Sequence, residues 1–254
     1  MAIIYKSRSE IEKMRAANLV VCSVLDELEA MIAPGVTTGE LGDRATALCK
    51  KHKVTPAFLG YGDPPFPSVV CISVNDEVVH GIPDHGRVLQ EGDIVSIDFG
   101  VEREGYFGDS ARTIPVGKVS PRAEKLMRVT RESLDRAIDA CKVTNRLHDV
   151  SRAVQEHVEA NGFSVVRTFV GHGIGRRMHE DPAVPNFVDG GGKNPRLRDG
   201  MVLAIEPMVN EGGYEVMVDA QDRWTARTRD GKLSAHFEHS VAITAEGPVV
   251  LSRA

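Results

Sequence analysis

Apolar residues in the first fifty positions follow the spacing of helices. Residues 7–33 place an apolar side chain every three or four positions, which predicts a helix with one buried face. Ser7 is followed three residues later by Glu10, and Thr37 by Glu40; both pairs have the spacing of a capping box. We therefore expect one helix across 7–33 and a second from Thr37 to about residue 51.

The remainder of the chain predicts two more helices and several strands. Ser120-Pro121 begins a helix that runs to about residue 141, because proline suits the first helical position. A fourth helix is expected at about 147–161, where Gly162 ends it. Strands are expected where apolar and polar residues alternate: near 69–74, 164–171, 201–209, 214–228 and 235–243, with a hairpin across 96–110.

The order helix, helix, strands occurs twice, which predicts a repeated unit. No low-complexity stretch or linker divides the chain, so we expect one domain, residues 1–254. Its two similar halves are roughly 1–117 and 118–254. The fold class is α+β, with a largely antiparallel sheet covered by helices.

The hairpin at 96–110 contains two acids in apolar surroundings. Residues 95, 97, 99 and 101 are apolar and face one way, whereas Asp98 faces the other. A loop centred between residues 103 and 104 places Asp98 opposite Asp109, and one centred a residue later places Asp109 opposite Gly100. Either register leaves both carboxylates on one face, with Cβ atoms roughly 4.5–8 Å apart. Two carboxylates this close repel unless positive charge lies between them, although solvated acids at a hairpin tip are an alternative.

Three further polar residues interrupt apolar strands. His172 ends the strand expected at 164–171, Glu206 shares a face with Val202 and Ala204, and Glu238 lies on the face of Ser240. For each one alone, a sheet edge or a backbone hydrogen bond is the better explanation.

Together with Asp98 and Asp109 these residues make four carboxylates and one imidazole where burial is expected. Buried acids need partners, and these strands supply few Lys or Arg neighbours. Two divalent cations would balance four carboxylates. Oxygen-rich ligands with one imidazole suit Mn, Fe(II), Co or Zn, and the absence of thiolates argues against a structural zinc site.

Composition narrows the class of protein. The 254 residues are 42% hydrophobic and 26% charged, with a net charge of −5, so charge gives no case for nucleic-acid or membrane binding. No apolar run is long enough for a transmembrane helix, and the N-terminus lacks a signal peptide. Four scattered cysteines fit reduced thiols, and a cytoplasmic location is expected.

Seven ordered motifs, within a match from about Ile11 to Leu251, resemble the type I methionine aminopeptidases of the pita-bread fold, in the bacterial form without an N-terminal extension. They are HGIPD at 80–84, SIDFG around Asp98, GDSART around Asp109, GHGIG around His172, HEDPAVPN from His179, IEPM around Glu206 and FEHSVAIT around Glu238. The resemblance implies a pseudo-twofold antiparallel sheet with helices on its outer face and the metal site on its inner face.

The resemblance also implies roles for the five polar residues and two histidines. Asp98 binds one of two divalent metal ions (Co, Mn, Fe(II) or Zn), Asp109 and Glu238 bridge both, and His172 and Glu206 bind the other. A hydroxide activated by the two ions attacks the scissile carbonyl, and Glu206 also moves protons. His80 and His179 lie near the metals without binding them and contact the substrate; without the resemblance, both are ordinary turn or loop histidines.

The same resemblance implies a pocket for the methionine side chain. Phe66 stands where tyrosine is usual and Met178 where phenylalanine is common, so the shape of this pocket differs from the family's. Asn75 and Ser234 match positions that help hold a monovalent cation in relatives, although a turn role explains Asn75 equally well. The pocket walls by position are Tyr61, Phe66, Cys71, Met178 and Trp224.

The function implied is removal of the initiator methionine from nascent proteins and peptides with a small second residue. The expected partners are N-terminal methionyl peptides and nascent chains, with transient ribosome contact and a monomeric state, and neither nucleic acid nor membrane. Three alternatives remain: an Xaa-Pro metallopeptidase of the same fold, a non-catalytic binding protein, and a structural Ca²⁺ or Mg²⁺ site. His172 as a ligand argues against the last, because those ions prefer oxygen.

Overall fold

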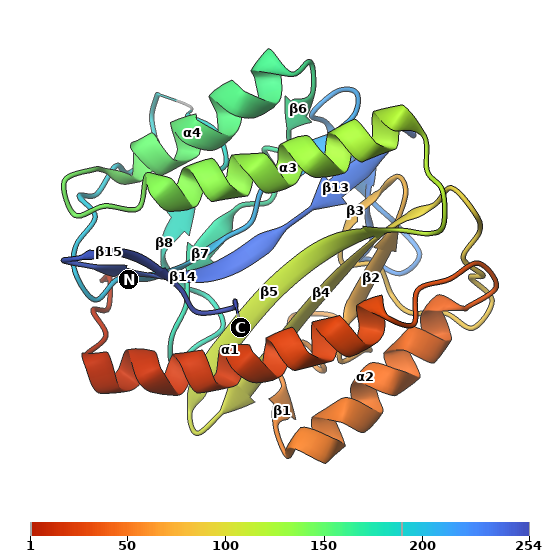
Figure 1. Cartoon of the computed structure of the whole chain (residues 1–254), viewed down its shortest axis with the longest axis horizontal. Helices are drawn as coiled ribbons and strands as arrows, with labels where there is room; N and C mark the ends of the chain where they lie inside the picture. The colour runs from red at the N-terminus through yellow and green to blue at the C-terminus, as the bar shows by residue number, and fades with distance from the viewer. Residues whose placement is uncertain (1, 189, 254) are drawn as a thin grey trace.

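A computed structural model describes residues 2–188 and 190–253 and consists of a curved antiparallel sheet with helices packed on one side (Figure 1). The helices are α1 (Arg8–Glu29), α2 (Thr38–His52), α3 (Pro121–Asp139) and α4 (Leu147–Ala160). The main sheet has the strand order β1 (Thr55–Pro56), β4 (Ile94–Arg103), β5 (Tyr106–Pro115), β14 (Glu238–Thr244), β9 (Val202–Ile205), β7 (Gly171–Gly173) and β8 (Glu180–Val184). Two more strands pair with members of this sheet: β2 (Cys71–Val74) with β4, and β15 (Gly247–Val250) with β14.

Two small sheets complete the structure described. One has the order β13 (Ser234–His236), β10 (Met208–Asn210) and β6 (Ser164–Val165). The other has the order β11 (Val216–Val218), β12 (Ala226–Thr228) and β3 (Glu77–Val79). None of the helices in the described ranges is long and apolar enough to cross a bilayer.

The four helices begin where the sequence predicts. The Ser7 and Thr37 side chains each accept a hydrogen bond from the third helical N–H, and Glu10 and Glu40 bond back, so both capping boxes form. Ser120 caps α3 in the same way, ahead of a proline in the first turn. These caps satisfy N–H groups that would otherwise lack partners at the helix ends.

Each pair of helices covers one half of the sheet with an apolar core. Ile97 and Phe99 of β4 lie in the core beneath α1 and α2, and Leu203 of β9 and Val241 of β14 lie in the core beneath α3 and α4. Because alternate residues of a strand face opposite sides, Asp98 and Glu238 face away from the helices. The expected helix-covered sheet with the polar residues on its other face is confirmed; the repeat of 1–117 in 118–254 stays a prediction.

The hairpin adopts the second of the two expected registers. Gly100 pairs with Asp109, and Asp98 pairs with Ala111, so the two acids are diagonal neighbours on one face. The loop centre therefore lies between residues 104 and 105, where Gly105 has φ +81°.

Four strands expected to be continuous are interrupted in the structure. Glu206 lies between β9 and β10 instead of inside a strand, because Pro207 has no N–H for a ladder hydrogen bond. The strand expected at 235–243 divides at Phe237, the one at 214–228 divides into β11 and β12, and the one at 164–171 divides into β6 and β7.

Candidate metal centre

Five polar residues from separate parts of the chain line one cavity of about 270 Å³. The cavity lies on the sheet face that the helices do not cover. These residues are Asp98 of β4, Asp109 of β5, His172 of β7, Glu206 after β9 and Glu238 at the start of β14. The structure thus brings together all five residues that the sequence singles out as ligands.

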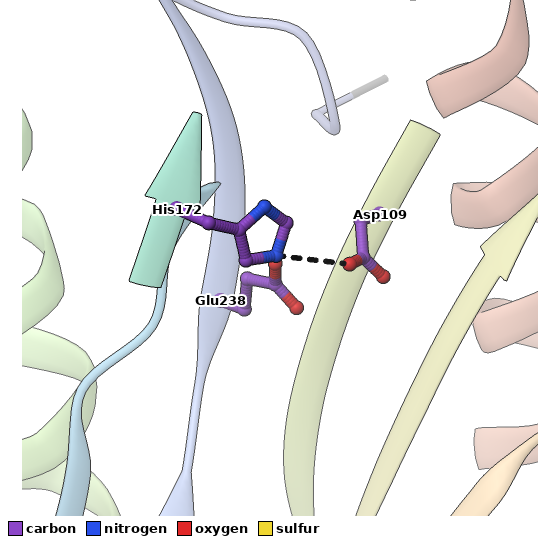
Figure 2. Close-up of side chains that lie close together, drawn as sticks. All are labelled: Asp109, His172 and Glu238. Carbon is purple, nitrogen blue, oxygen red and sulfur yellow. Dashed lines mark ion pairs between the residues drawn. The ribbon is translucent and has the colours of Figure 1, made fainter. Parts of the chain in front are cut away.

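Asp109, His172 and Glu238 come from three strands and point toward a common centre (Figure 2). Their ligand atoms all lie within 4.8 Å of one another. The His172 Nε2 atom is 3.9 Å from Asp109 Oδ2 and 3.6 Å from Glu206 Oε1. These separations are too long for hydrogen bonds, yet they suit atoms that each lie about 2.0–2.2 Å from a shared ion.

The four carboxylates are buried without a cation from the protein. Among the described residues, neither Lys nor Arg lines the cavity. Burial raises the pKa of Asp98 to about 7. Burial and mutual repulsion raise the pKa values of the other three acids well above their usual range: Asp109, Glu206 and Glu238.

Three carboxylate oxygens in this cavity have no hydrogen-bond partner: Asp98 Oδ1, Asp109 Oδ1 and Glu238 Oε1. A buried polar atom without a partner is costly, so each one calls for a ligand. Divalent cations would satisfy these oxygens and offset the repulsion between the acids. The donor set therefore fits two divalent metal ions with oxygen and imidazole ligands.

His172 is prepared for binding a cation through one nitrogen. Its Nδ1 atom lies 2.9 Å from the Gly173 carbonyl oxygen, which accepts the Nδ1 proton. Burial lowers the pKa of this imidazole to about 3, so the ring is neutral. The Nε2 lone pair consequently faces the carboxylates, which is the tautomer that metal binding requires.

Backbone ties hold Asp109 and Glu238 in register with each other. The Asn18 side chain of α1 accepts the Asp109 N–H (3.2 Å), and the Ser240 hydroxyl donates to the Asp109 carbonyl oxygen (2.9 Å). The Ser110 hydroxyl donates to the Glu238 carbonyl oxygen (2.6 Å). The sequence analysis did not identify these supports, because they join residues distant along the chain.

His80 enters the cavity from a constrained turn after β3. Its φ of +62° lies in the left-handed region, where residues other than glycine are uncommon. The neighbouring Gly81 donates its N–H to Ser73 Oγ (3.0 Å), and a Cβ on Gly81 would lie 2.2 Å from the Ile72 carbonyl oxygen. This close approach to β2 fixes the backbone that carries His80. Burial lowers the pKa of His80 to about 4, so the ring is neutral.

His179 lies across the cavity, beside His172. The two imidazole centroids are 4.2 Å apart, and Tyr61 Oη lies 2.6 Å from His179 Nδ1. Burial lowers the pKa of His179 as well, so His80 and His179, which are not predicted as metal ligands, are both neutral near pH 7.

Apolar side chains form the rest of the cavity. All five residues predicted as walls line it: Tyr61, Phe66, Cys71, Met178 and Trp224. The Trp224 ring meets Phe66 and His80 edge to face, with centroids 5.2 and 5.8 Å away. Five further residues line the cavity that the sequence analysis does not assign to its wall: Phe58, Val79, Phe169, Val170 and Met208.

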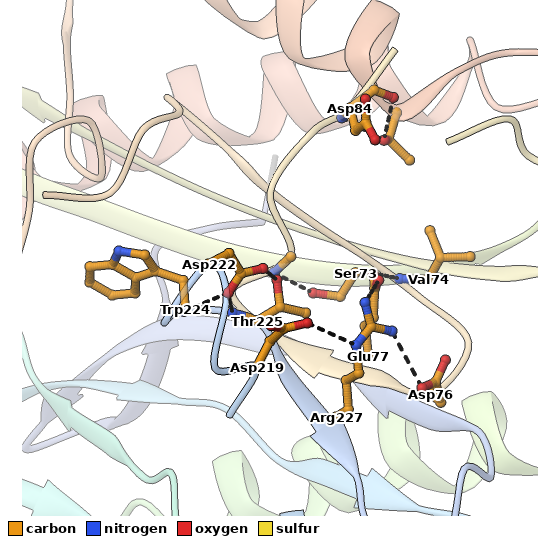
Figure 3. A network of polar contacts seen from close by, with 12 residues as sticks. Ser73, Val74, Asp76, Glu77, Asp84, Asp219, Asp222, Trp224, Thr225 and Arg227 are labelled. Carbon is orange, nitrogen blue, oxygen red and sulfur yellow. Dashed lines mark hydrogen bonds and ion pairs between the residues drawn. The ribbon is translucent and has the colours of Figure 1, made fainter. Parts of the chain in front are cut away.

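The Trp224 backbone is held by a polar network at the rim (Figure 3). The Asp222 carboxylate accepts the N–H groups of Trp224 (2.7 Å) and Thr225 (2.9 Å) and the Thr225 hydroxyl (2.6 Å). Arg227, two residues later, pairs with Glu77 of β3 at 2.9 Å. The network therefore joins the loop that carries Trp224 to the strand that leads into His80.

The two histidines that flank Glu238 in the sequence differ in their surroundings. His236 Nε2 faces Glu206 Oε2 at 3.8 Å, whereas His239 turns away and bonds Ser252 (2.8 Å). Asn75 bonds Asp93 through its side chain (2.7 Å), and its carbonyl accepts the Ser234 N–H (2.8 Å). These bonds agree with a turn role for Asn75.

Comparison with known proteins agrees with this geometry. Residues 12–245 match the model of metallopeptidase family M24. The chain is 52% identical to the methionine aminopeptidase of Clostridium perfringens over 98% of both chains. The structure matches the crystal structure of the methionine aminopeptidase of Thermotoga maritima with a TM-score of 0.95 and 47% identity over 100% of both chains.

A more distant structure shares the fold alone. An Xaa-Pro dipeptidase from Bacillus anthracis matches with a TM-score of 0.78 and 21% identity, over 98% of this chain and 62% of the dipeptidase. The fold is thus common to both enzyme types, whereas the high sequence identity is to one of them. The chain belongs to metallopeptidase family M24 and, within it, to the methionine aminopeptidases.

Proposed function

We propose that this protein removes the N-terminal methionine from peptides and newly made proteins whose second residue is small. The observation that carries the proposal is one cavity that joins four carboxylates, three of them with a buried oxygen that lacks a partner, to an apolar wall. The carboxylates and His172 provide a metal site, and the wall provides a place for an uncharged side chain. Relatives that share about half of their residues with this chain are named for the same activity.

The metal ligands belong to this proposal. Asp98 would hold one ion, Asp109 and Glu238 both, and His172 with Glu206 the other. Two divalent ions, of the class that includes Mn, Fe(II), Co and Zn, would polarise a carbonyl group and lower the pKa of water toward about 7. The protein's part is to hold four carboxylates and one neutral imidazole around that position.

His80 and His179 are placed to act on the substrate. His80 is half-buried and His179 is exposed, and both rings are neutral near pH 7, so an N–H of each can donate to a carbonyl oxygen as negative charge develops there. Glu206 lies between His172 and His236 and can move a proton from water to the leaving amine. The free α-amine of a substrate could reach an ion or a nearby carboxylate at this site, which would explain why the enzyme acts as an exopeptidase.

The apolar wall selects the side chain. Trp224, Phe66 and Met178 all line the cavity, and the aromatic rings can make favourable contacts with a thioether. A charged side chain would lose its hydration there without gaining a partner. Methionine fits this requirement because it is flexible, apolar and unbranched.

Finer expectations accompany the proposal. We infer action on nascent chains in the cytoplasm, by a monomer in transient contact with the ribosome. A monovalent cation near Asn75 and Ser234 also belongs to the proposal. None of these expectations affects the chemistry of the cavity.

The test is release of free methionine from the peptide Met-Ala-Ser by purified protein loaded with Mn²⁺. Met-Leu-Ser, with a bulky second residue, and Ala-Pro-Ser, an Xaa-Pro substrate, are the controls. The proposal predicts release from Met-Ala-Ser and little from either control. Cleavage of Ala-Pro-Ser in preference to Met-Ala-Ser would contradict it.

A further inference from the structure

A buried ion pair lies outside the cavity, between the N-terminal segment and β8. Lys6 Nζ is 2.7 Å from Glu180 Oε2, and the two side chains are only 3% and 1% exposed. The residues are 174 positions apart, so this bond joins distant parts of the chain. Neither residue lines the cavity, and the proposed mechanism uses neither.

The Glu180 carboxylate holds the loop that precedes it. Its second oxygen, Oε1, accepts the backbone N–H groups of Arg176 (2.9 Å) and Arg177 (3.2 Å). This loop, residues 174–179, connects His172 to His179. One carboxylate therefore binds the loop through one oxygen and Lys6 through the other.

The same loop supplies two of the cavity's groups. Met178 and His179, at its end, both line the cavity. At its start, the His172 ring hydrogen-bonds the backbone of Gly173 and also that of Met178. A shift of the loop would move His179 directly and would remove one support of the His172 ring.

Lys6 itself is fixed by the backbone around it. Its N–H donates to the Gly200 carbonyl oxygen (2.7 Å), and its ammonium group also donates to the Ile4 carbonyl oxygen (3.2 Å). Gly175 leaves the room that the pair needs, because a Cβ there would lie 2.4 Å from Lys6 Cε and 2.8 Å from Glu180 Oε1. The ammonium group is thus held at one position beside the loop.

We propose that Lys6 is a positioning residue: its charge fixes the Glu180 carboxylate, which in turn holds the 174–179 loop so that Met178 and His179 face the cavity. A buried ion pair gives little net stability compared with apolar residues of the same shape, because desolvation offsets the attraction. It does fix the direction of each group. Loss of the lysine alone leaves a buried carboxylate without its cation. That carboxylate then either turns toward water or becomes protonated.

Charge pairing predicts an order among three variants. Lys6→Met leaves Glu180 buried without a cation and has the largest effect. Glu180→Gln keeps an oxygen for the two N–H groups and has an intermediate effect. The double variant removes both charges and keeps that oxygen, so it recovers toward the wild type.

The catalytic consequence rests on the proposed function. In Lys6→Met, the kcat for methionine release is expected to fall about tenfold or more, because a small displacement of His179 spoils its alignment with the substrate. KM changes less, because most of the apolar wall comes from other segments. At saturating Mn²⁺ the variant still binds the same number of ions as the wild type.

Tryptic digestion measures how often the 174–179 loop opens, and this measurement does not depend on enzymatic activity. Arg176 and Arg177 are cleavage sites inside the loop, and their N–H groups are bonded to Glu180 in the wild type. Under native conditions the first cut in Lys6→Met is expected at these residues, at least about fivefold faster than in the wild type, because local opening sets the rate. Mass spectrometry identifies the cut.

Leu126→Ala is the matched control for lost stability. Leu126 is a fully buried residue of α3, in a different apolar cluster from Met178 of the loop, and its truncation lowers the melting temperature. This variant should keep the wild-type kcat and should not be cut first at Arg176 or Arg177. A positioning role is thereby separated from general destabilisation.

The outcomes divide clearly. Faster loop cleavage and lower kcat in Lys6→Met, with recovery in the double variant, support the inference. Unchanged cleavage and kcat in Lys6→Met, or in Glu180→Gln if Lys6→Met does not fold, overturn it; so does equal loss in the single and double variants. If the wild type releases no methionine, the proposed function fails, and the cleavage rates still decide the inference about the loop.

Discussion

Two groups of acidic residues lie close together in this fold, and they differ in where their counter-charge comes from. At the rim, one arginine, Arg227, holds three acids: Asp76 at 3.4 Å, Glu77 at 2.9 Å and Asp219 at 4.0 Å (Figure 3). In the cavity, four acids converge, and neither Lys nor Arg from the described residues lines the space.

The pKa values follow this difference. The acids at the rim raise the pKa of Arg227, which stays charged and paired. Burial raises the pKa of Glu77 at the rim too, and the charge of Arg227 partly offsets that shift. In the cavity no lysine or arginine among the described residues offsets burial, which raises the pKa of Asp98 to about 7. A cluster of acidic residues therefore does not by itself indicate a metal site. Buried acids that have no Lys or Arg partner in the protein do indicate one.

The largest expected effect comes from removing an acid that belongs to the cavity. Asp109→Ala should lower kcat/KM about a thousandfold or more, because it takes away a ligand expected to bind both ions. Metal analysis after gel filtration should find fewer ions per chain. Glu77→Gln at the rim is the matched control and should keep both activity and metal. Near-normal turnover of Asp109→Ala with two bound ions would show that the site is assigned wrongly.

The next effect separates a substrate contact from a ligand. His80→Ala should reduce kcat about a hundredfold, as expected for loss of one hydrogen-bond donor to developing negative charge. Its metal content should match that of the wild type, because His80 is not a proposed ligand. Steady-state kinetics with metal analysis on the same sample decides this. Loss of metal from His80→Ala would make the histidine a ligand and contradict its proposed role.

The affinity of the cavity for metal ions should depend on pH. Without metal, the raised pKa values leave protons on the acids near pH 7, with Asp98 at about 7. An incoming cation must displace those protons, so affinity falls as pH falls, by about tenfold per pH unit for each proton displaced. Calorimetry of Mn²⁺ binding from pH 6 to 8 in two buffers measures the protons released. Constant affinity across that range would contradict the predicted protonation.

The smallest effect concerns the rim itself. Asp222→Ala removes three hydrogen bonds that hold Trp224 and Thr225, so KM for Met-Ala-Ser should rise about three- to tenfold with kcat little changed. Trp224 is the only tryptophan in the sequence, so its fluorescence reports the loop directly. Asp219→Ala is the control, because it loses the long contact to Arg227 and the bond from the Gln221 N–H but no bond from Trp224 or Thr225. An unchanged KM and fluorescence spectrum in Asp222→Ala would show that the Asp222 carboxylate does not position Trp224.

Local patterns predicted much of the fold and of the site. The capping boxes at Ser7 and Thr37 and the alternation around Asp98 need only neighbouring residues, so they can be read from sequence. Ordered motifs located the five polar residues that line the cavity. The hairpin register was narrowed to two choices, and the structure selects the one that pairs Gly100 with Asp109.

Features that depend on distant contacts were not predicted. Glu206 lies outside a strand because Pro207 interrupts the ladder, although the apolar pattern continues through both residues. The Asn18 and Ser240 ties to Asp109 and the pair of Lys6 with Glu180 join residues more than ninety positions apart. Periodicity contains no signal for such contacts, because it describes one element at a time.

The central claim is that the four acids of the cavity and His172 hold two metal ions that the reaction needs. The most direct test is a titration of metal-free protein with Mn²⁺, in which calorimetry counts the ions and methionine release from Met-Ala-Ser is followed in parallel. The account predicts no release without metal, and activity that saturates as about two ions bind per chain. Full activity in the metal-free protein, or binding that saturates without any gain in methionine release, would contradict it.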